Sequence, residues 1–306
     1  MNAESWWKRR AGCAREMLVA ACRQAMGKPG EPRLAAALGD VFSRPGTMVR
    51  AVVTYLIGIE MGMLEECARA IACGIEYLHT ASLIFDDLPA MDDARLRRGA
   101  PCLHVVHGEA VAMLAALAMV NRGYMLLWQG MSAAPAARRM EAGKLVDECL
   151  GIEGLTGGQA YDIAGWRGEQ DPAEVAAVAA RKTAALLRLA VGLPALCGRA
   201  SERELQLLDR LALLRGLAYQ AADDLKDVSA EPADSGKSSG RDEELGRPNL
   251  VAAEGMAAAL RRFSRLQQTG DRVASALPGP PERWGMLGLL RVDAPALPLG
   301  EAREAG

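Results

Sequence analysis

The chain has 306 residues, of which 50% are hydrophobic, and its formal net charge at pH 7 is −2. Nucleic-acid-binding proteins normally carry a basic face, so this near balance of charge argues against a nucleic-acid partner. Seven cysteines are scattered without CxxC pairs or a Cys/His ligand spacing, which indicates buried thiols in a reducing cytoplasm.

The first part of the chain predicts helices separated by Gly- and Pro-rich breaks, because alanine, leucine and methionine are plentiful and β-branched runs are short. An amphipathic helix over residues 1–26 is followed by a turn at 27–32 and a short helix over 33–42. A long apolar helix is expected over 48–63. The next one, over 65–87, is apolar on nearly all sides and is therefore expected to be central to the fold.

The rest of the chain continues this helical pattern. Further helices are expected over residues 108–130, 138–155, 172–195, 202–228 and 251–275. The first of these is so apolar that we expect it to be buried. The polar segment 229–249 contains several glycines and predicts a mobile loop.

Nothing in the sequence divides this helical region into domains, since it shows no repeat and no convincing linker. We therefore predict one all-α domain over residues 1–276, followed by a poorly ordered Pro-, Gly- and Ala-rich tail over 277–306. The longest uncharged apolar run, 110–120, is too short to span a membrane, and the N-terminal apolar run is too short for a signal peptide. A soluble cytoplasmic enzyme without a transmembrane segment is the expectation.

Two groups of aspartates stand out from this apolar background. The first group lies in the segment 79–99 and consists of Asp86, Asp87, Asp92 and Asp93. The second group, near residue 225, consists of Asp223, Asp224 and Asp227. Clustered carboxylates repel one another unless a cation lies between them, and oxygen ligands suit Mg²⁺, which often shares its ligands with substrate phosphates. The two groups together indicate a magnesium site that binds a diphosphate.

The local setting of each group supports this interpretation. Pro89 lies between the acidic pairs of the first group, so the helix over 65–87 should end or distort there. In the second group, Asp223 and Asp227 are four residues apart and share one helix face. A solvated helix face is the alternative for such a cluster. The largely apolar segment 217–222 immediately upstream favours the functional interpretation.

The order and spacing of several motifs over residues 30–260 resemble the trans-isoprenyl diphosphate synthases, or polyprenyl synthetases, and most of all their bacterial geranylgeranyl-forming type. The matching motifs are DDLPAMD at 86–92, RRG at 97–99, GGQAYD at 157–162, Lys182-Thr183, Gln220, DDLKD at 223–227 and GKSSGRD at 236–242. The resemblance implies a single-domain helical bundle around a deep central cavity, with three Mg²⁺ ions bound at its mouth.

The resemblance also implies roles for individual residues. The implied metal ligands are Asp86, Asp87, Asp92 and Asp223, with Asp224 and Asp227 acting directly or through metal-bound water. The implied contacts of the allylic diphosphate are Arg97, Lys182, Thr183, Gln220 and Lys237. Catalysis would rest on the first four aspartates and Lys182. For each isolated cation, and for Lys237 in its loop above all, a simple surface charge is the alternative.

The second substrate, isopentenyl diphosphate, would be bound by Arg50, His79 and Arg98. The family has a Gly-Lys-Arg-x-Arg segment here, whereas this chain has Thr47 and Met48 in place of the Lys and the first Arg. A charged hydrogen bond to phosphate contributes about 1.5–3 kcal/mol, so the acceptor site is expected to be weakened or retuned.

The implied reaction is a Mg²⁺-dependent condensation in which the allylic diphosphate ionises and the isopentenyl double bond attacks the resulting cation. By the same resemblance, the small residues Ala81 and Ser82 before Asp86 imply a twenty-carbon product, geranylgeranyl diphosphate, with farnesyl diphosphate left open. The alternative is that both residues simply pack against a neighbouring helix. Two alternatives stay open: a diverged prenyltransferase or terpene cyclase that uses no isopentenyl diphosphate, and a non-catalytic partner subunit. A homodimer is expected from the resemblance alone.

Overall fold

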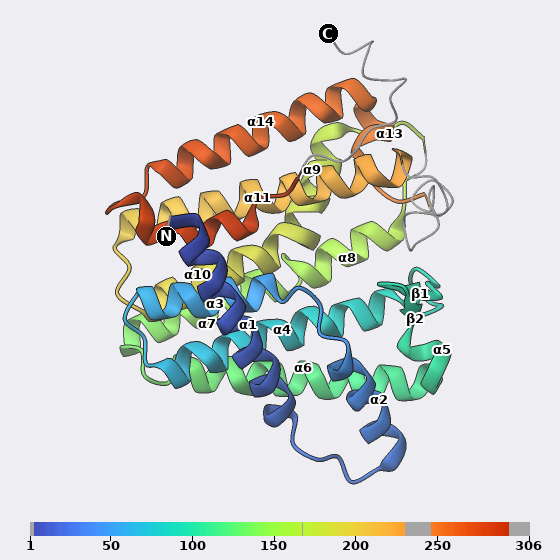
Figure 1. Cartoon of the computed structure of the whole chain (residues 1–306). Coiled ribbons are helices and arrows are strands. Elements are labelled where there is room, and N and C mark those ends of the chain that lie inside the picture. Colours follow the sequence, from blue (N-terminus) through green and yellow to red (C-terminus); the bar gives the residue numbers. More distant parts are fainter. Residues whose placement is uncertain (1–2, 167, 230–245, 294–306) are drawn as a thin grey trace. The chain divides into compact units, whose positions relative to one another are not determined.

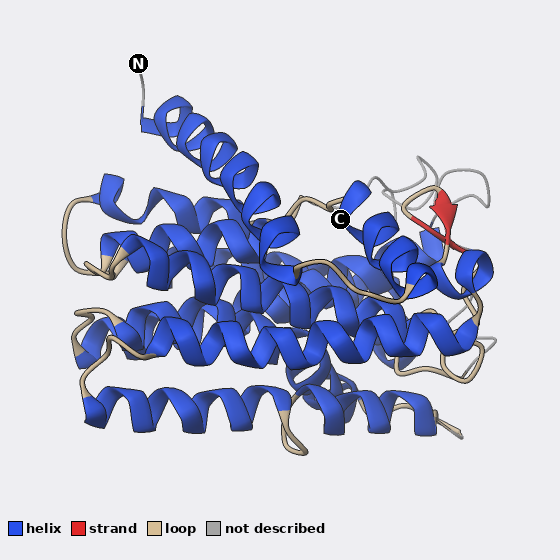
Figure 2. Ribbon diagram, turned by 90° about the horizontal axis from the view of Figure 1, so that it is seen from below, coloured by secondary structure: helices blue, strands red, loops and turns tan. Residues whose placement is uncertain are grey.

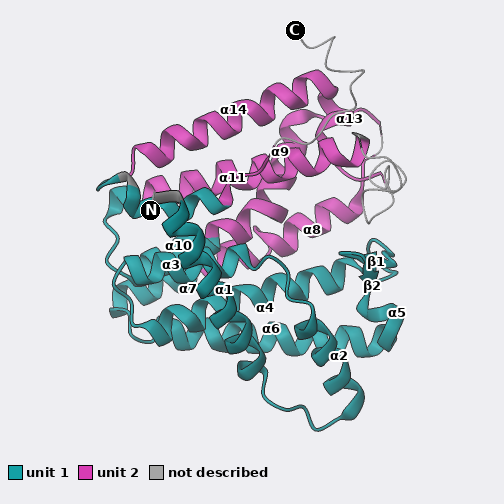
Figure 3. Ribbon diagram, viewed as in Figure 1, with its two compact units in different colours: residues 1–145, 189–205, 278–289 teal, residues 146–188, 206–277, 290–306 magenta. Residues whose placement is uncertain are grey.

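The computed structural model describes residues 3–166, 168–229 and 246–293 (Figure 1). The predicted all-α class is confirmed, because the described residues form helices together with one two-stranded antiparallel hairpin (Figure 2). The chain forms two compact units, and each unit is assembled from segments that are distant in the sequence (Figure 3).

The first unit comprises residues 1–145, 189–205 and 278–289. Its elements begin with α1 (Ala3–Met26), α2 (Pro32–Ser43), α3 (Val49–Glu60), α4 (Glu65–Asp86), β1 (Leu96–Arg97), β2 (Ala100–Pro101), α5 (Leu103–His107) and α6 (Glu109–Met131). Helix α7 (Ala136–Leu150) begins in this unit and continues into the second.

The first unit is built around α4, as its apolar sequence predicts. Tyr77, Ile71 and Ile75 of this helix are fully buried, and α4 packs against α3 and α6. Gly74 allows α6 to approach closely, because a Cβ at this position would overlap the Leu127 side chain.

The expected burial of the helix over residues 108–130 is wrong for one face of α6. Its apolar residues are so numerous that they cover more than the face that packs on α4. The exposed apolar residues are Met113, Leu114, Leu117, Tyr124, Met125 and Trp128, each with 44–63% of its surface accessible to solvent. By length and composition alone, α6 is the one helix among the described residues that could cross a membrane, a test that the core helices of soluble proteins also pass.

The expected poor order of the tail is also wrong where the structure describes it. Pro281–Leu290 forms a 3₁₀ helix, in which Trp284, Met286 and Leu287 are buried. The indole of Trp7 donates a hydrogen bond to the carbonyl oxygen of Glu282 at 2.7 Å, so apolar and polar contacts both fix this segment. Residues 294–306 lie outside the described residues.

The second unit comprises residues 146–188, 206–277 and 290–306. Its helices are α8 (Leu155–Ala164), α9 (Pro172–Ala179), a π-helix (Ala180–Ala184), α10 (Ala185–Cys197), α11 (Glu202–Ser229), α13 (Leu250–Glu254) and α14 (Met256–Ser275), of which α10 and α11 cross the boundary between the units. Val175, Ala222, Leu250 and Phe263 bring α9, α11, α13 and α14 into one apolar core. The sequence did not predict α8, or the break at Gly255 that separates α13 from α14.

Candidate functional site

The first acidic motif lies where α4 ends and the chain folds back on it. Pro89 cannot continue the helix, and the amide of Asp92 instead donates to the carbonyl oxygen of Asp86 at 2.9 Å. The amide of Ala94 donates to the carbonyl oxygen of Asp87 at 3.2 Å. These bonds satisfy carbonyl groups at the helix end and keep the backbone of Asp92 beside that of Asp86. The predicted end of the helix near Pro89 is confirmed, since α4 ends at Asp86.

The hairpin after this loop turns Arg97 onto Asp87. Arg98 and Gly99 both have positive φ angles, 54° and 74°, which is the two-residue turn that matches the twist of paired strands. Nε of Arg97 donates to both carboxylate oxygens of Asp87, at 2.7 and 2.8 Å, and Nη2 lies 2.6 Å from Oδ1. Burial opposes the charge of Arg97, but the hydrogen bonds and the charge of Asp87 outweigh it and raise the pKa of Arg97. Asp87 is therefore a buried carboxylate whose charge is balanced within the motif.

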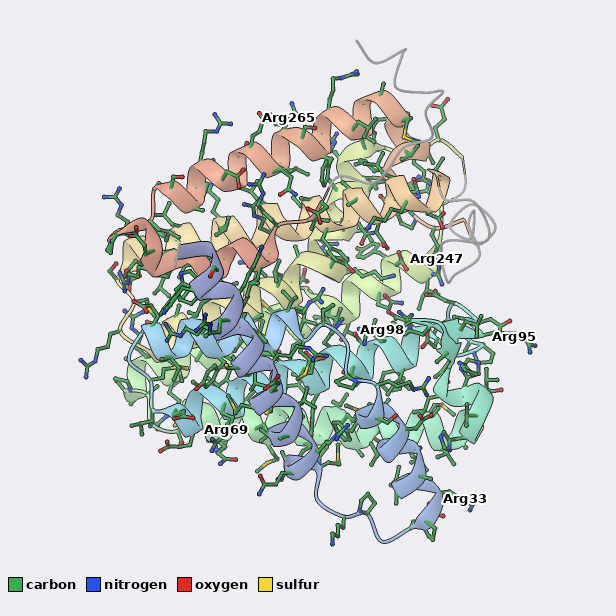
Figure 4. All side chains as sticks on the ribbon, in the orientation of Figure 1. Arg33, Arg69, Arg95, Arg98, Arg247 and Arg265 are labelled. Atoms are coloured by element: carbon green, nitrogen blue, oxygen red, sulfur yellow. The ribbon has the colours of Figure 1, made fainter. Side chains whose placement is uncertain are left out.

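Arg50, His79 and Arg98 are brought together in the first unit. Nη1 of Arg50 lies 3.3 Å from Nε2 of His79. Burial, followed by the charges of Arg50, Arg98 and Arg97, holds the pKa of His79 well below its usual range, so the ring is neutral and Nε2 can accept. Arg98 and Arg95 are both exposed (both labelled in Figure 4), but the guanidinium of Arg98 lies so close to Gly46 that a Cβ there would overlap it.

The two residues that replace family cations differ in their surroundings. Thr47 is exposed, whereas Met48 is buried and caps the start of α3 with a φ of 55°. The Met48 side chain belongs to the core of the first unit.

The second acidic motif lies within α11, where its aspartates differ in burial. Asp223 is exposed, whereas Asp224 is almost fully buried, and both of its carboxylate oxygens accept hydrogen bonds from protein groups. Nε2 of Gln220 donates to Oδ1 at 2.8 Å, and the amide of Leu250 donates to Oδ2 at 2.8 Å. Oγ1 of Thr183 donates to Oε1 of Gln220 at 2.7 Å. A continuous chain of hydrogen bonds therefore links Thr183, Gln220 and Asp224 to the start of α13.

Lys182 lies in the π-helix and is oriented by a carboxylate that the sequence reasoning did not assign. Its Nζ lies 2.5 Å from Oδ2 of Asp162, the last residue of the GGQAYD motif on α8. Gly158 of the same motif permits this contact, because a Cβ there would overlap the backbone of Arg181 and Lys182. Nη1 of Arg247 lies 3.7 Å from the same Asp162 oxygen. Short π-helices often occur at functional sites, so the irregularity agrees with a role for Lys182.

The donor chemistry of both motifs suits a hard cation, since all the candidate ligands are carboxylate oxygens. Within the described residues, no three His, Cys, Asp or Glu side chains are grouped closely enough to hold a metal ion by themselves. Asp86, Asp92 and Asp227 are half-buried and Asp223 is exposed, so these four are more accessible than Asp87 and Asp224. The predicted diphosphate ligand Lys237 lies outside the described residues.

The model of one protein family, described as polyprenyl synthetase, matches residues 31–273 of this chain. The farnesyl diphosphate synthase of Escherichia coli is 37% identical over 220 residues, which are 71% of this chain and 73% of the relative. The chloroplastic geranylgeranyl pyrophosphate synthase 9 of Arabidopsis thaliana is 35% identical over 243 residues, 76% of this chain and 68% of the relative.

Solved structures agree on the fold. A geranyltransferase of Helicobacter pylori, crystallised with magnesium and isoprenyl diphosphate, superposes with a TM-score of 0.77 at 24% identity. The match covers 95% of this chain and 96% of the other. At this level of identity, the likeness shows a shared all-α architecture.

Proposed function

This chain belongs to the polyprenyl synthetase family, and from that premise we propose that it condenses an allylic prenyl diphosphate with isopentenyl diphosphate to make geranylgeranyl diphosphate, or farnesyl diphosphate. The observation that carries the proposal is the match of the family model, which spans both acidic motifs. The names of the relatives support the reaction class, since they are synthases of these two products.

The acidic residues fit a magnesium-dependent site. The proposed ligands are Asp86, Asp87, Asp92 and Asp223, with Asp224 and Asp227 supporting them, for a proposed set of three Mg²⁺ ions. When bound, Mg²⁺ would neutralise the charge that develops on the departing diphosphate. The hydrogen bonds of Asp224 to Gln220 and Leu250 favour a supporting role for this residue. The crystal complex of the Helicobacter relative, which contains magnesium, supports the choice of metal.

The cationic residues complete the proposed allylic site. Arg97 and Lys182 each lie against an aspartate, which fixes their positions before a diphosphate arrives. Thr183 and Gln220 lie in one hydrogen-bonded chain and add polar groups, and Lys237 is proposed as a further diphosphate ligand. The guanidinium and ammonium charges would stabilise the leaving diphosphate, and an apolar cavity would protect the carbocation from water.

The acceptor, isopentenyl diphosphate, is assigned to the first unit. Arg50 and Arg98 would contact its diphosphate, and neutral His79 can donate one hydrogen bond from its second ring nitrogen while Nε2 faces Arg50. Residues 47 and 48 carry no charge, which supports a weaker or altered acceptor site. The two alternatives are therefore an enzyme that uses no isopentenyl diphosphate and a non-catalytic subunit.

The decisive experiment is product analysis of the purified chain with Mg²⁺, farnesyl or geranyl diphosphate, and labelled isopentenyl diphosphate. The proposal expects longer products that contain the label, and none without Mg²⁺. Consumption of the allylic substrate into unlabelled hydrocarbons, with or without isopentenyl diphosphate, would instead identify a cyclase. No consumption under any condition would identify a non-catalytic subunit.

The product is proposed to be the twenty-carbon geranylgeranyl diphosphate. Ala81 lies five residues before Asp86 on α4 and is fully buried. The proposal is that its small side chain, unlike a bulky one, would not block a growing chain there. Ser82 is half-buried, and its hydroxyl donates to the carbonyl oxygen of His79 at 2.8 Å. Product lengths after dephosphorylation and chromatography test this part of the proposal.

A homodimer in the cytoplasm is the proposed working form. The exposed apolar face of α6, from Met113 to Trp128, supports self-association, because large contiguous apolar patches are uncommon on monomers. Asn121 is exposed near the middle of this face, and an amide can both donate to and accept from its symmetry mate across a two-fold axis. Light scattering should give a dimer mass for the wild type and a monomer mass for Leu117→Glu. The cysteines with described surroundings are free thiols, in keeping with a reducing compartment.

A further inference from the structure

The uncharged segment before α3 is contacted by arginines that come from two other elements. Nη2 of Arg15 on α1 donates to the carbonyl oxygen of Gly46 at 3.0 Å and to that of Pro45 at 3.5 Å. The guanidinium of Arg98 lies directly against Gly46. The segment in which Thr47 and Met48 replace the family's Lys and Arg is therefore adjacent to two guanidinium groups from distant parts of the sequence.

A buried carboxylate lies in the same region. Glu76 on α4 is 8% exposed, and its Oε2 has no hydrogen-bond partner among the described residues. With Gly46 and Arg98 it lines a cavity of about 40 Å³, which is large enough for water but too small for a diphosphate. Burial raises the pKa of Glu76, although Arg50, Arg98 and Arg15 act in the opposite direction. Three arginines, from α3, the hairpin and α1, thus lie close enough to Glu76 to lower its pKa electrostatically.

Arg15 is half-buried and keeps hydrogen-bond donors that its backbone contacts do not use. Arg15 makes both of its hydrogen bonds through one nitrogen, and within the described residues no carboxylate lies within ion-pair distance of it. A guanidinium has five N–H donors, so Arg15 keeps donors for a further partner.

We propose that Arg15 is a binding residue for the diphosphate of the acceptor and supplies, from α1, positive charge that residues 47 and 48 lack. The inference rests on the proposed function, which places isopentenyl diphosphate at Arg50, His79 and Arg98. Arg15 precedes residues 31–273, so the family match does not assign it. The site therefore depends on α1, which brings a cation from outside the matched region.

The test varies each substrate separately in steady-state assays of two Arg15 variants. Arg15→Gln keeps an N–H donor for the Gly46 carbonyl but removes the charge, so KM for isopentenyl diphosphate should rise about tenfold. The KM for the allylic diphosphate and the melting temperature should stay close to wild type. Arg15→Lys restores the charge and should recover most of the lost affinity.

Arg23→Ala is the matched control. Arg23 lies on the same helix and also donates to a backbone carbonyl, that of Phe42, at 2.7 and 3.0 Å, but Glu76 is not among its partners. Its removal should leave both KM values unchanged.

Other outcomes separate the two proposals. If wild-type enzyme incorporates no isopentenyl diphosphate, the proposed function fails before any variant is made. If wild type does so and Arg15→Gln has the same KM for isopentenyl diphosphate, the assignment of Arg15 is overturned while the function stands. A joint change of both KM values with a lower melting temperature, equal for Arg15→Gln and Arg15→Lys, would also overturn it, because Arg15 would then only hold the loop.

Discussion

The two acidic motifs contain the same Asp-Asp pair but place it in different settings. In each pair one aspartate is buried, Asp87 in the first unit and Asp224 in the second, while Asp86 is half-buried and Asp223 is exposed. The buried members differ in what balances them. Asp87 accepts hydrogen bonds from a guanidinium, whereas Asp224 accepts from an amide side chain and a backbone amide.

A buried carboxylate needs partners in the folded protein, so Asp87 and Asp224 each help to hold their own motif together. The proposed function adds a metal-binding role for Asp87 and for the more accessible aspartates. A charged partner and neutral partners also respond differently to substitution, because removing an ion-pair member leaves a buried charge. The predictions below separate these roles.

The largest expected effects are on turnover, in Asp223→Ala and in Asp87→Ala. Removing Asp223 from the proposed metal site should lower kcat by at least about a hundredfold. The melting temperature should not fall, because the Asp223 side chain is exposed. Near-wild-type kcat in this variant would remove Asp223 from the proposed metal site.

Asp224→Ala should lower stability more than Asp223→Ala does, because two hydrogen-bond donors lose their acceptor. The loss in the free energy of unfolding should be about 1–3 kcal/mol for each partner left unsatisfied, Gln220 and the Leu250 amide. Urea unfolding measures it. Equal stability of Asp223→Ala and Asp224→Ala would contradict the contrast between the two aspartates.

Asp87→Ala should abolish turnover and also destabilise the protein, by about 2–4 kcal/mol, because Arg97 is left without its partner in a largely buried position. Helical circular dichroism should persist. The double variant Asp87→Ala/Arg97→Ala should be less destabilised than the sum of the single variants, by about 1–3 kcal/mol. Simple additivity would mean that the pair contributes nothing to the first motif.

Ala81→Phe tests whether the helix of the first motif also sets product length. Phe at this fully buried position should shift the main product from twenty to fifteen carbons and cost about 1–3 kcal/mol of stability through overpacking. Ser82→Ala, which adds no bulk, is the control and should leave product length unchanged. Unaltered products from Ala81→Phe would place the growing chain elsewhere.

Thr47→Lys should lower KM for isopentenyl diphosphate by a factor of about 3–10, which is modest because position 47 is exposed. The allylic KM should not change. The gain should be larger in the Arg15→Gln background, since a new cation there replaces a missing one. An unchanged KM in both backgrounds would show that residue 47 does not face the acceptor.

The smallest effect concerns the stability profile with pH. Burial raises the pKa of Glu76 in the folded protein, so between the unfolded value, 4.5, and the raised value the folded state binds more protons than the unfolded state. Stability should therefore fall as pH rises through this range. Glu76→Gln should remove that part of the slope, which unfolding curves at several pH values would detect.

Much of the fold and of the candidate site was predictable because local signals determine it. Apolar periodicity and breaks rich in Gly and Pro predicted most helices, and Pro89 placed the end of α4 at the first motif. The spacing of the aspartates, together with the motifs around Lys182 and Gln220, predicted the family. These features depend on residues that are close in the sequence.

Tertiary packing decided the rest. Which aspartate of each pair is buried depends on Arg97 and on Leu250, and the partner of Lys182 is Asp162 on another helix. The exposed face of α6, the packed segment around Trp284 and the contact of Arg15 with Gly46 were equally beyond the sequence. Burial and charge pairing arise between segments far apart in the chain, so an apolar or charged pattern alone does not show which side chain will meet which.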